Sequence, residues 1–332
     1  MFFNDIIGQP AAVNIFRQVL DSSRLSHAYI FLGPSGVGKF LFARTLAKIL
    51  MCENKNADWT QKGDDSCRSC KWIDKNCHPN LKITEVAKGS QKISIDAVIA
   101  IEKELMLMPF SKTRRVFIVN EAERMSEEAF NAFLKTLEEP VKDTVIILVT
   151  SNLASLPQTV VSRCQVIRFY PLEQSLVTKH LETHLKIKHE DALLLSHLAD
   201  GSIGDACKLH SQNLLVQREH LIKGLLNDNS ERLAKDIIAY AKNNSEDNEG
   251  LRGEIIWQLK IIGLFIRDAL WLHHGLPDNK LLNKDRITET KQYQRRYNYK
   301  QVERLLERLL KSERYIRLNA NYSLVVESLF VA

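Results

Sequence analysis

A glycine-rich loop near the N-terminus constrains the fold of this chain more than any other feature. The loop, Gly33-Pro-Ser-Gly-Val-Gly-Lys39, follows the short apolar run Ala28–Leu32 and precedes a helix-like segment from Phe40 to Leu50. Glycines adopt positive φ angles and let backbone N–H groups approach an anion, and the lysine reaches terminal phosphates. The candidate nucleotide-binding residues are Gly33, Pro34, Ser35, Gly36, Val37, Gly38 and Lys39. The pattern predicts a buried strand, a phosphate-binding turn and a helix.

Apolar runs and helical segments alternate through the first half of the chain. Further strands are predicted at Leu81–Val86, Val116–Val119 and Val145–Val149, and helices at Ile95–Met106 and Ser126–Leu137. Such alternation predicts an α/β fold with a mostly parallel sheet flanked by helices. Ser126 is a plausible N-cap for the second of these helices, since its hydroxyl can accept a bond from the first turn.

The strand signal fades after Tyr170-Pro171, and the rest of the chain reads as helical. A chain of 332 residues also exceeds the roughly 250–300 that one hydrophobic core serves. We expect three domains: a P-loop α/β domain over 1–169, a small helical lid over 170–210 and an all-α domain over 211–332. The polar run Asn243–Gly250 is predicted as a loop, and Val302, Leu305, Leu306, Leu309 and Leu310 as one apolar helical stripe.

Two positions that normally hold Mg²⁺ in a phosphate-binding site are altered. The residue after the lysine is usually Ser or Thr, whose hydroxyl binds the metal, and here it is Phe40. The carboxylate that ends a later apolar strand is replaced by Asn120, and a neutral amide is a poor Mg²⁺ ligand. Glu121, which would polarise the attacking water, is retained. These changes predict a degraded magnesium site without hydrolysis, and they leave nucleotide binding without turnover open.

Charge and composition are weaker guides. The formal charge of +6 permits contact with nucleic acid without requiring it. The basic tract Lys284–Arg317, with its interleaved tyrosines, is either a nucleic-acid contact or a solvated helical face. The apolar stretches are too short to cross a bilayer, and the first residues lack a basic secretory n-region. We therefore expect a cytoplasmic protein that does not enter membranes.

Several short motifs accompany the glycine-rich loop: Asp5–Gln9, Arg24–Ala28, His78-Pro79, Asn131–Pro140, Leu156-Pro157 and Ser162-Arg163-Cys164. Together they resemble the AAA+ clamp-loader subunits of bacterial DNA polymerase III, and most closely the delta prime group. They span nearly all of the first two expected domains. Asn319–Asn321 and the helix after it support the third domain more weakly.

The resemblance implies roles for three further positions. In such loaders the arginine of the Ser-Arg-Cys motif, here Arg163, projects into the ATP site of the neighbouring subunit, where such fingers are worth about 10³–10⁵ in rate. Thr150 stands at the sensor position. Gly204 occupies the place of a second sensor arginine, which hydrolysing relatives carry. The alternative for Arg163 is a structural salt bridge.

The cysteines between 52 and 77 fall where the resemblance implies an inserted zinc module. The candidate ligands are Cys52, Cys67, Cys70 and Cys77, and Cys67-x-x-Cys70 has the spacing of a zinc knuckle. Asp64 lies where another cysteine is expected, so Cys77, Asp64 and His78 compete for the fourth position. The alternative is a degenerate module of reduced thiols without metal.

The resemblance implies a non-hydrolysing subunit of the clamp loader of a DNA-directed DNA polymerase, acting in chromosomal replication. Its partners would be the gamma/tau ATPase subunits, the delta subunit, the sliding clamp and, through the complex, primer–template DNA, with the C-terminal domain forming an oligomerisation collar. Two alternatives stay open: an active gamma/tau-like AAA+ ATPase, and a stand-alone module that binds zinc and nucleic acid.

Overall fold

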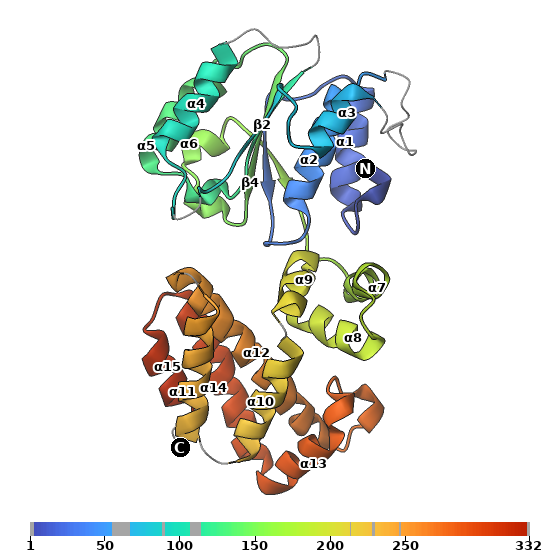
Figure 1. Cartoon of the computed structure of the whole chain (residues 1–332), viewed down its shortest axis with the longest axis vertical. Coiled ribbons are helices and arrows are strands. Elements are labelled where there is room, and N and C mark those ends of the chain that lie inside the picture. Colours follow the sequence, from blue (N-terminus) through green and yellow to red (C-terminus); the bar gives the residue numbers. More distant parts are fainter. Residues whose placement is uncertain are drawn as a thin grey trace. The chain divides into compact units, whose positions relative to one another are not determined.

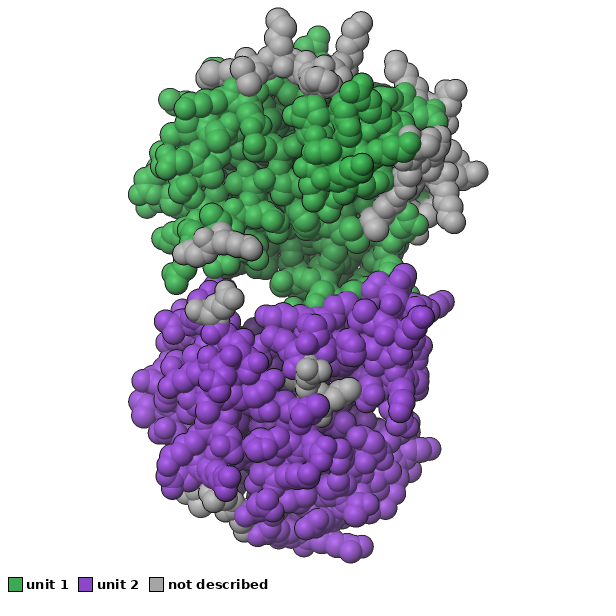
Figure 2. Space-filling model, in the orientation of Figure 1, with its two compact units in different colours: residues 1–176, 201–205 green, residues 177–200, 206–332 purple. Residues whose placement is uncertain are grey.

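The structure, a computed structural model, describes residues 3–54, 67–87, 90–106, 114–212, 214–227, 230–245 and 247–330. It divides into two compact units, coloured separately in Figure 2: unit 1 comprises Met1–Leu176 and Gly201–Asp205, and unit 2 comprises Val177–Asp200 and Ala206–Ala332. The three-domain boundaries near 170 and 210 stay predictions. Among the described residues, no helix combines the length and apolarity needed to span a membrane.

Unit 1 is built on a five-stranded sheet with all neighbouring strands parallel (Figure 1). The strand order is β2-β3-β4-β1-β5. The strands are β1 (Ala28–Leu32), β2 (Leu81–Thr84), β3 (Arg115–Val119), β4 (Thr144–Thr150) and β5 (Gln165–Arg168). The α/β prediction is confirmed, and the four predicted strands lie within two residues of their expected bounds. β5 was not predicted.

Helices cover both faces of this sheet (Figure 1). They are α1 (Pro10–Asp21), α2 (Lys39–Met51), α3 (Arg68–Asp74), α4 (Ile95–Met106), α5 (Glu127–Glu138) and α6 (Gln158–Val161), with short 3-10 turns at Phe3–Asp5, Ala122–Arg124 and Leu153–Ser155. Tyr29 and Phe31 pack on the α1–α2 side, and Ala28 and Ile30 on the α4–α5 side. This alternation follows from the two-residue period of a strand. α5 begins as predicted, because the Ser126 hydroxyl accepts a hydrogen bond from the Ala129 backbone N–H.

The remaining elements are helical, as predicted. They are α7 (Gln174–Leu185), α8 (His189–Leu198), α9 (Ile203–Ser211), α10 (Leu214–Leu226), α11 (Ser230–Asn243), α12 (Asn248–His273), α13 (Ile287–Arg296), α14 (Tyr299–Arg317) and α15 (Tyr322–Phe330), with 3-10 turns at Asp278–Lys280 and Lys284–Arg286. The long helix α12 forms the centre of unit 2 and packs against α10, α11, α13 and α14.

Two local predictions in unit 2 differ from the structure in extent. The expected loop Asn243–Gly250 is shorter, because the Asp247 carboxylate accepts from the Gly250 N–H and starts α12 at Asn248. The expected apolar stripe of α14 is also narrower. Val302 and Leu309 are buried, whereas Leu310 is 62% exposed. Five apolar residues close together fill more of the helix circumference than the one face that packs on the core.

The basic tract forms α13, α14 and the turns beside them. Several of its cations pair with carboxylates: Arg286 with Glu219 and Glu289, and Lys291 with Asp278. Tyr293 is buried and therefore cannot stack on a base. These contacts favour the solvated helical face over the nucleic-acid contact.

Candidate functional site: a covered phosphate loop and an exposed arginine

The glycine-rich loop has the backbone geometry that the sequence predicts. It leaves the end of β1 and leads into α2, with Gly36 at φ +68° and Gly38 at φ +98°. The Gly33 N–H donates to the Thr150 carbonyl across 3.2 Å, which joins the start of the loop to the end of β4. Only glycine adopts these positive φ angles without strain, so the loop keeps the shape of a phosphate-binding turn.

The lysine of this loop bonds to the loop itself. The Lys39 ammonium donates to the carbonyl oxygens of Gly33 (2.6 Å) and Pro34 (2.5 Å), and the residue is only 7% exposed. Burial lowers the pKa of Lys39, and the negative charges of Glu123, Asp205 and Glu121 oppose that shift. The cation that would meet a terminal phosphate is therefore already held by two carbonyl groups.

A segment distant in sequence covers the loop. The Gly204 N–H donates to the Gly36 carbonyl across 3.0 Å. A Cβ added at Gly204 would lie 2.8 Å from the Gly36 Cα, and one added at Gly36 would lie 2.1 Å from the Ser202 Oγ. Both glycines are thus required for the close approach of two backbones. Gly204 occupies the position where hydrolysing relatives carry a sensor arginine. Because Gly204 has no side chain, the segment Gly201–Asp205 can pack directly on the phosphate loop.

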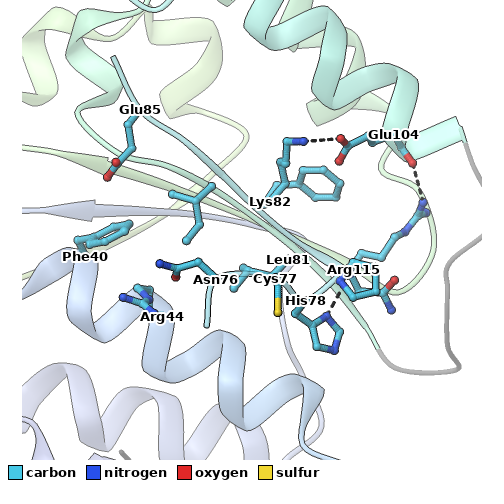
Figure 3. Close-up of a pocket in the computed structure, with 14 residues that line it drawn as sticks. Phe40, Arg44, Asn76, Cys77, His78, Leu81, Lys82, Glu85, Glu104 and Arg115 are labelled. Atoms are coloured by element: carbon cyan, nitrogen blue, oxygen red, sulfur yellow. Dashed lines mark hydrogen bonds and ion pairs between the residues drawn. The ribbon is translucent and has the colours of Figure 1, made fainter. Parts of the chain in front are cut away.

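One altered metal position, Phe40, lines a cavity beside the edge strand β2, and the other, Asn120, is bonded to Glu85, which also lines it. Phe40 is half-buried against the apolar core on the α1–α2 side of the sheet. The Asn120 amide donates to Glu85 across 3.0 Å. Phe40 and Glu85 both line a cavity of about 750 Å³ (Figure 3), whose far side carries the ion pair between Lys82 and Glu104. An aromatic ring and a hydrogen-bonded amide thus occupy the places of the hydroxyl and carboxylate ligands.

The retained acidic and sensor residues are engaged in local contacts. Glu121 adopts a left-handed backbone at φ +54° and pairs with Arg124 across 3.1 Å. The Thr150 hydroxyl donates to the Asn152 carbonyl (3.2 Å) and accepts from the Asn152 N–H (3.1 Å) in a tight turn.

Glu123 is a site residue that the sequence reasoning missed. Burial tends to raise the pKa of Glu123, but hydrogen bonds from the Ser151 hydroxyl (2.5 Å) and N–H (3.0 Å) outweigh it and lower that pKa. Glu123 also acts on Lys39 more strongly than Glu121 does. Its sequence signal was weak, because the place directly after Asn120 favours Glu121 and nothing in the sequence marks Glu123.

Arg163 lies at the surface of unit 1, between α6 and β5. One guanidinium nitrogen, Nη2, pairs with the Glu138 carboxylate across 2.6 Å, and the other, Nη1, donates to the Thr159 carbonyl across 2.8 Å. The Arg163 side chain is 35% exposed and that of Glu138 is 50% exposed. The guanidinium is therefore held in place but open to solvent. The salt bridge that was the alternative role for Arg163 is therefore present, and it lies at the surface of unit 1.

Three of the four candidate zinc ligands lie together. The sulfur atoms of Cys52, Cys67 and Cys70 are all within 4.8 Å of one another, and those of Cys52 and Cys67 are 3.9 Å apart. Four sulfurs around zinc at bond lengths of 2.3 Å are separated by about 3.8 Å. Burial by itself would raise the pKa of Cys67, but the backbone N–H groups of Glu53 and Cys70 stabilise its thiolate and lower that pKa. The three thiols fit three corners of a zinc tetrahedron.

Cys77 and His78, the two candidates for the fourth ligand that lie in the described part of the chain, are not in this group. Cys77 is exposed, and its thiol donates to the Trp72 carbonyl across 3.6 Å. Both ring nitrogens of His78 are engaged, one with the Ser69 hydroxyl (3.1 Å) and the other with the Asn80 N–H (3.1 Å). Asp64 lies outside the described residues. Cys77 and His78 therefore have other partners here, and the fourth ligand is not identified.

Comparison with known proteins gives a consistent result. Residues 8–173 match the family model described as DNA polymerase III, delta subunit, and residues 212–331 match the model of its C-terminal part. The delta prime subunit of Bacillus subtilis DNA polymerase III is 26% identical over 97% of this chain and 94% of that protein.

Two further likenesses cover different shares of the chain. The tau subunit of Bacillus subtilis DNA polymerase III is 29% identical over 81% of this chain, which spans about half (48%) of that longer protein. A gamma-subunit-related protein of Thermotoga maritima aligns over 96% of both chains, with 18% identity and a TM-score of 0.42. The two family models decide the assignment, because together they cover the α/β unit and the helical C-terminal part. The chain belongs to the DNA polymerase III delta-subunit family.

Proposed function

We propose that this chain is a delta prime-like, non-hydrolysing subunit of the clamp loader of DNA polymerase III. In this role it supplies Arg163 to the ATP bound by a neighbouring ATPase subunit, and the assembled ring opens a sliding clamp and places it on primed DNA. Its partners are gamma/tau-type ATPase subunits and a delta subunit, with the helical C-terminal region contributing the ring contacts. The complex works in the bacterial cytoplasm at the replication fork.

One contrast carries the proposal. The chain's own phosphate loop is covered by Gly201–Asp205 and its lysine is bonded to loop carbonyls, whereas Arg163 is exposed at the surface. A guanidinium aimed at a transferring phosphoryl group stabilises the charge that develops there. A subunit can therefore lose its own hydrolysis and still accelerate that of its neighbour.

The zinc module is the second part of the proposal. Cys52, Cys67 and Cys70 would hold a structural zinc ion, which would fasten the start of α3 to the end of α2. Such an ion supplies folding free energy and takes no part in hydrolysis.

The first experiment uses the isolated chain. We expect no Mg²⁺-dependent ATP hydrolysis above the level of a Lys39→Ala variant, because Phe40 and Asn120 do not supply the usual ligands of the metal. Hydrolysis that disappears in the Lys39→Ala variant would contradict the proposal and favour the gamma/tau-like ATPase.

The second experiment uses the complex reconstituted from gamma/tau-type, delta and delta prime-like subunits. Arg163→Ala should abolish the DNA-stimulated ATP hydrolysis that depends on the adjoining site, by about 10³-fold or more at that site. Arg168→Ala is the matched control, since Arg168 is an exposed arginine of the neighbouring strand β5 and should change nothing. Equal stimulated ATPase in the wild-type and Arg163→Ala complexes would contradict the finger role.

A further inference from the structure

The contact between Arg163 and Glu138 joins two separate parts of unit 1. Glu138 is the last residue of α5, and Arg163 follows α6. The carboxylate approaches Nη2 to 2.6 Å, which is short even for a charge-assisted hydrogen bond. Nη1 of Arg163 donates a hydrogen bond to the carbonyl of Thr159 in α6. The two terminal nitrogens of the guanidinium are thus both engaged while the chain is alone.

The same two nitrogens would meet the phosphate oxygens of a neighbouring nucleotide. A guanidinium binds phosphate through parallel N–H donors, so a carboxylate already on Nη2 takes one of the positions that the phosphate needs. A carboxylate left at that distance would also lie beside the triphosphate, where like charges repel. Release of Glu138 would free this N–H donor for phosphate and remove the neighbouring negative charge when the subunits meet.

We propose that Glu138 is a positioning residue that holds Arg163 in the free subunit and competes with the neighbour's nucleotide for it. This inference rests on the proposed function, because it names the side chain that binds Arg163 before Arg163 reaches the neighbour's ATP. The pair is exposed on both sides, and such surface pairs shift an equilibrium by about two- to five-fold. The contact is strong enough to orient the guanidinium and weak enough to be exchanged for a triphosphate.

The test is Glu138→Gln in the reconstituted clamp-loader complex, with KM for ATP and kcat of DNA-stimulated hydrolysis measured separately. The substitution keeps the shape of the side chain and removes its charge, so the competing anion is lost. We expect KM for ATP to fall about two- to five-fold while kcat is unchanged.

Two further variants make this result specific. Glu139→Gln is the matched control, because Glu139 is also exposed and lies one residue along the chain. It should leave both constants at their wild-type values. In the Arg163→Ala background, Glu138→Gln should have no further effect, since the group for which the carboxylate competes is absent.

The outcomes separate the inference from the proposed function. If Arg163→Ala lowers ATPase but Glu138→Gln leaves KM unchanged, Glu138 does not compete and the inference fails while the finger role stands. A fall in kcat with Glu138→Gln would overturn it in another way, because the carboxylate would then be needed during turnover. If Arg163→Ala has no effect, the proposed function fails and the inference fails with it.

Discussion

Gly204 packs directly against Gly36, so we expect the substitution Gly204→Ala to destabilise the structure, although glycine to alanine is normally tolerated in a helix. Gly204 lies in the first turn of α9, where alanine is normally favoured over glycine by up to about 1 kcal/mol. Here the new Cβ would lie 2.8 Å from the Gly36 Cα. That neighbour is a backbone atom, which cannot rotate away as a flexible side chain could.

The expected magnitude follows from these two opposing effects. Overpacking of this kind costs about 1–3 kcal/mol, and the gain in helix propensity offsets part of it. We expect Gly204→Ala to weaken the packing of Gly201–Asp205 on the loop by about 1–2 kcal/mol. Since about 1.4 kcal/mol corresponds to a factor of ten in an equilibrium constant, the loop should open roughly ten times more often.

Hydrogen exchange measured by mass spectrometry reports this opening directly. Peptides that contain residues 33–39 should exchange about tenfold faster in Gly204→Ala than in the wild type. Gly263→Ala is the control, because Gly263 lies inside α12 with no atom within 4 Å of an added Cβ. It should leave exchange in the loop unchanged and stabilise the chain by up to about 1 kcal/mol. Unchanged exchange at 33–39 in Gly204→Ala would refute the reasoning.

Three other experiments test separate parts of the structure. Cys70→Ser should lower the zinc content of the purified chain, measured by inductively coupled plasma mass spectrometry, whereas Cys77→Ser should not; equal loss in both would contradict the three-thiol site. Ser126→Ala should destabilise unit 1 by about 1 kcal/mol in urea unfolding, because α5 loses its N-cap. Burial raises the pKa of Glu254, so its charged form is disfavoured in the folded state. Glu254→Gln should therefore be more stable than wild type at pH 7, with a gap in unfolding free energy that narrows as the pH falls toward about 4.3, the pKa of an unfolded glutamate; a gap that widened at low pH would contradict this sign.

Local patterns predicted much of unit 1 from the sequence. The glycines, the lysine and the flanking apolar runs fixed the strand, turn and helix around residues 28–50, because each of these depends on neighbours in the chain. The N-cap at Ser126 is local in the same way. The short strand β5 was missed because two of its four residues are exposed polar side chains, and pairing with β1 makes it a strand.

Contacts between distant residues were beyond the sequence. The family motif showed that Gly204 replaces an arginine. The motif could not show the hydrogen bond from Gly204 to Gly36, because these residues are 168 positions apart (204 minus 36). Arg163 was identified through the family motif, whereas nothing in the sequence paired it with Glu138. Cys77 was a candidate zinc ligand because it falls in the interval of the expected module, yet its thiol bonds to the Trp72 carbonyl. Contacts of this kind depend on which surfaces meet in the folded protein, and the spacing of residues along the sequence does not predict them.

The pairing of β5 with β1 links the two halves of the candidate site mechanically. β5 begins two residues after Arg163, and its register runs from Tyr29 opposite Gln165 to Leu32 opposite Arg168. The Phe169 N–H continues the ladder to the Leu32 carbonyl, directly before Gly33. A defect in the glycine loop would therefore displace β5, the strand that begins two residues after Arg163. Under the proposed function, mutations in this glycine loop should then slow ATP hydrolysis by a different polypeptide.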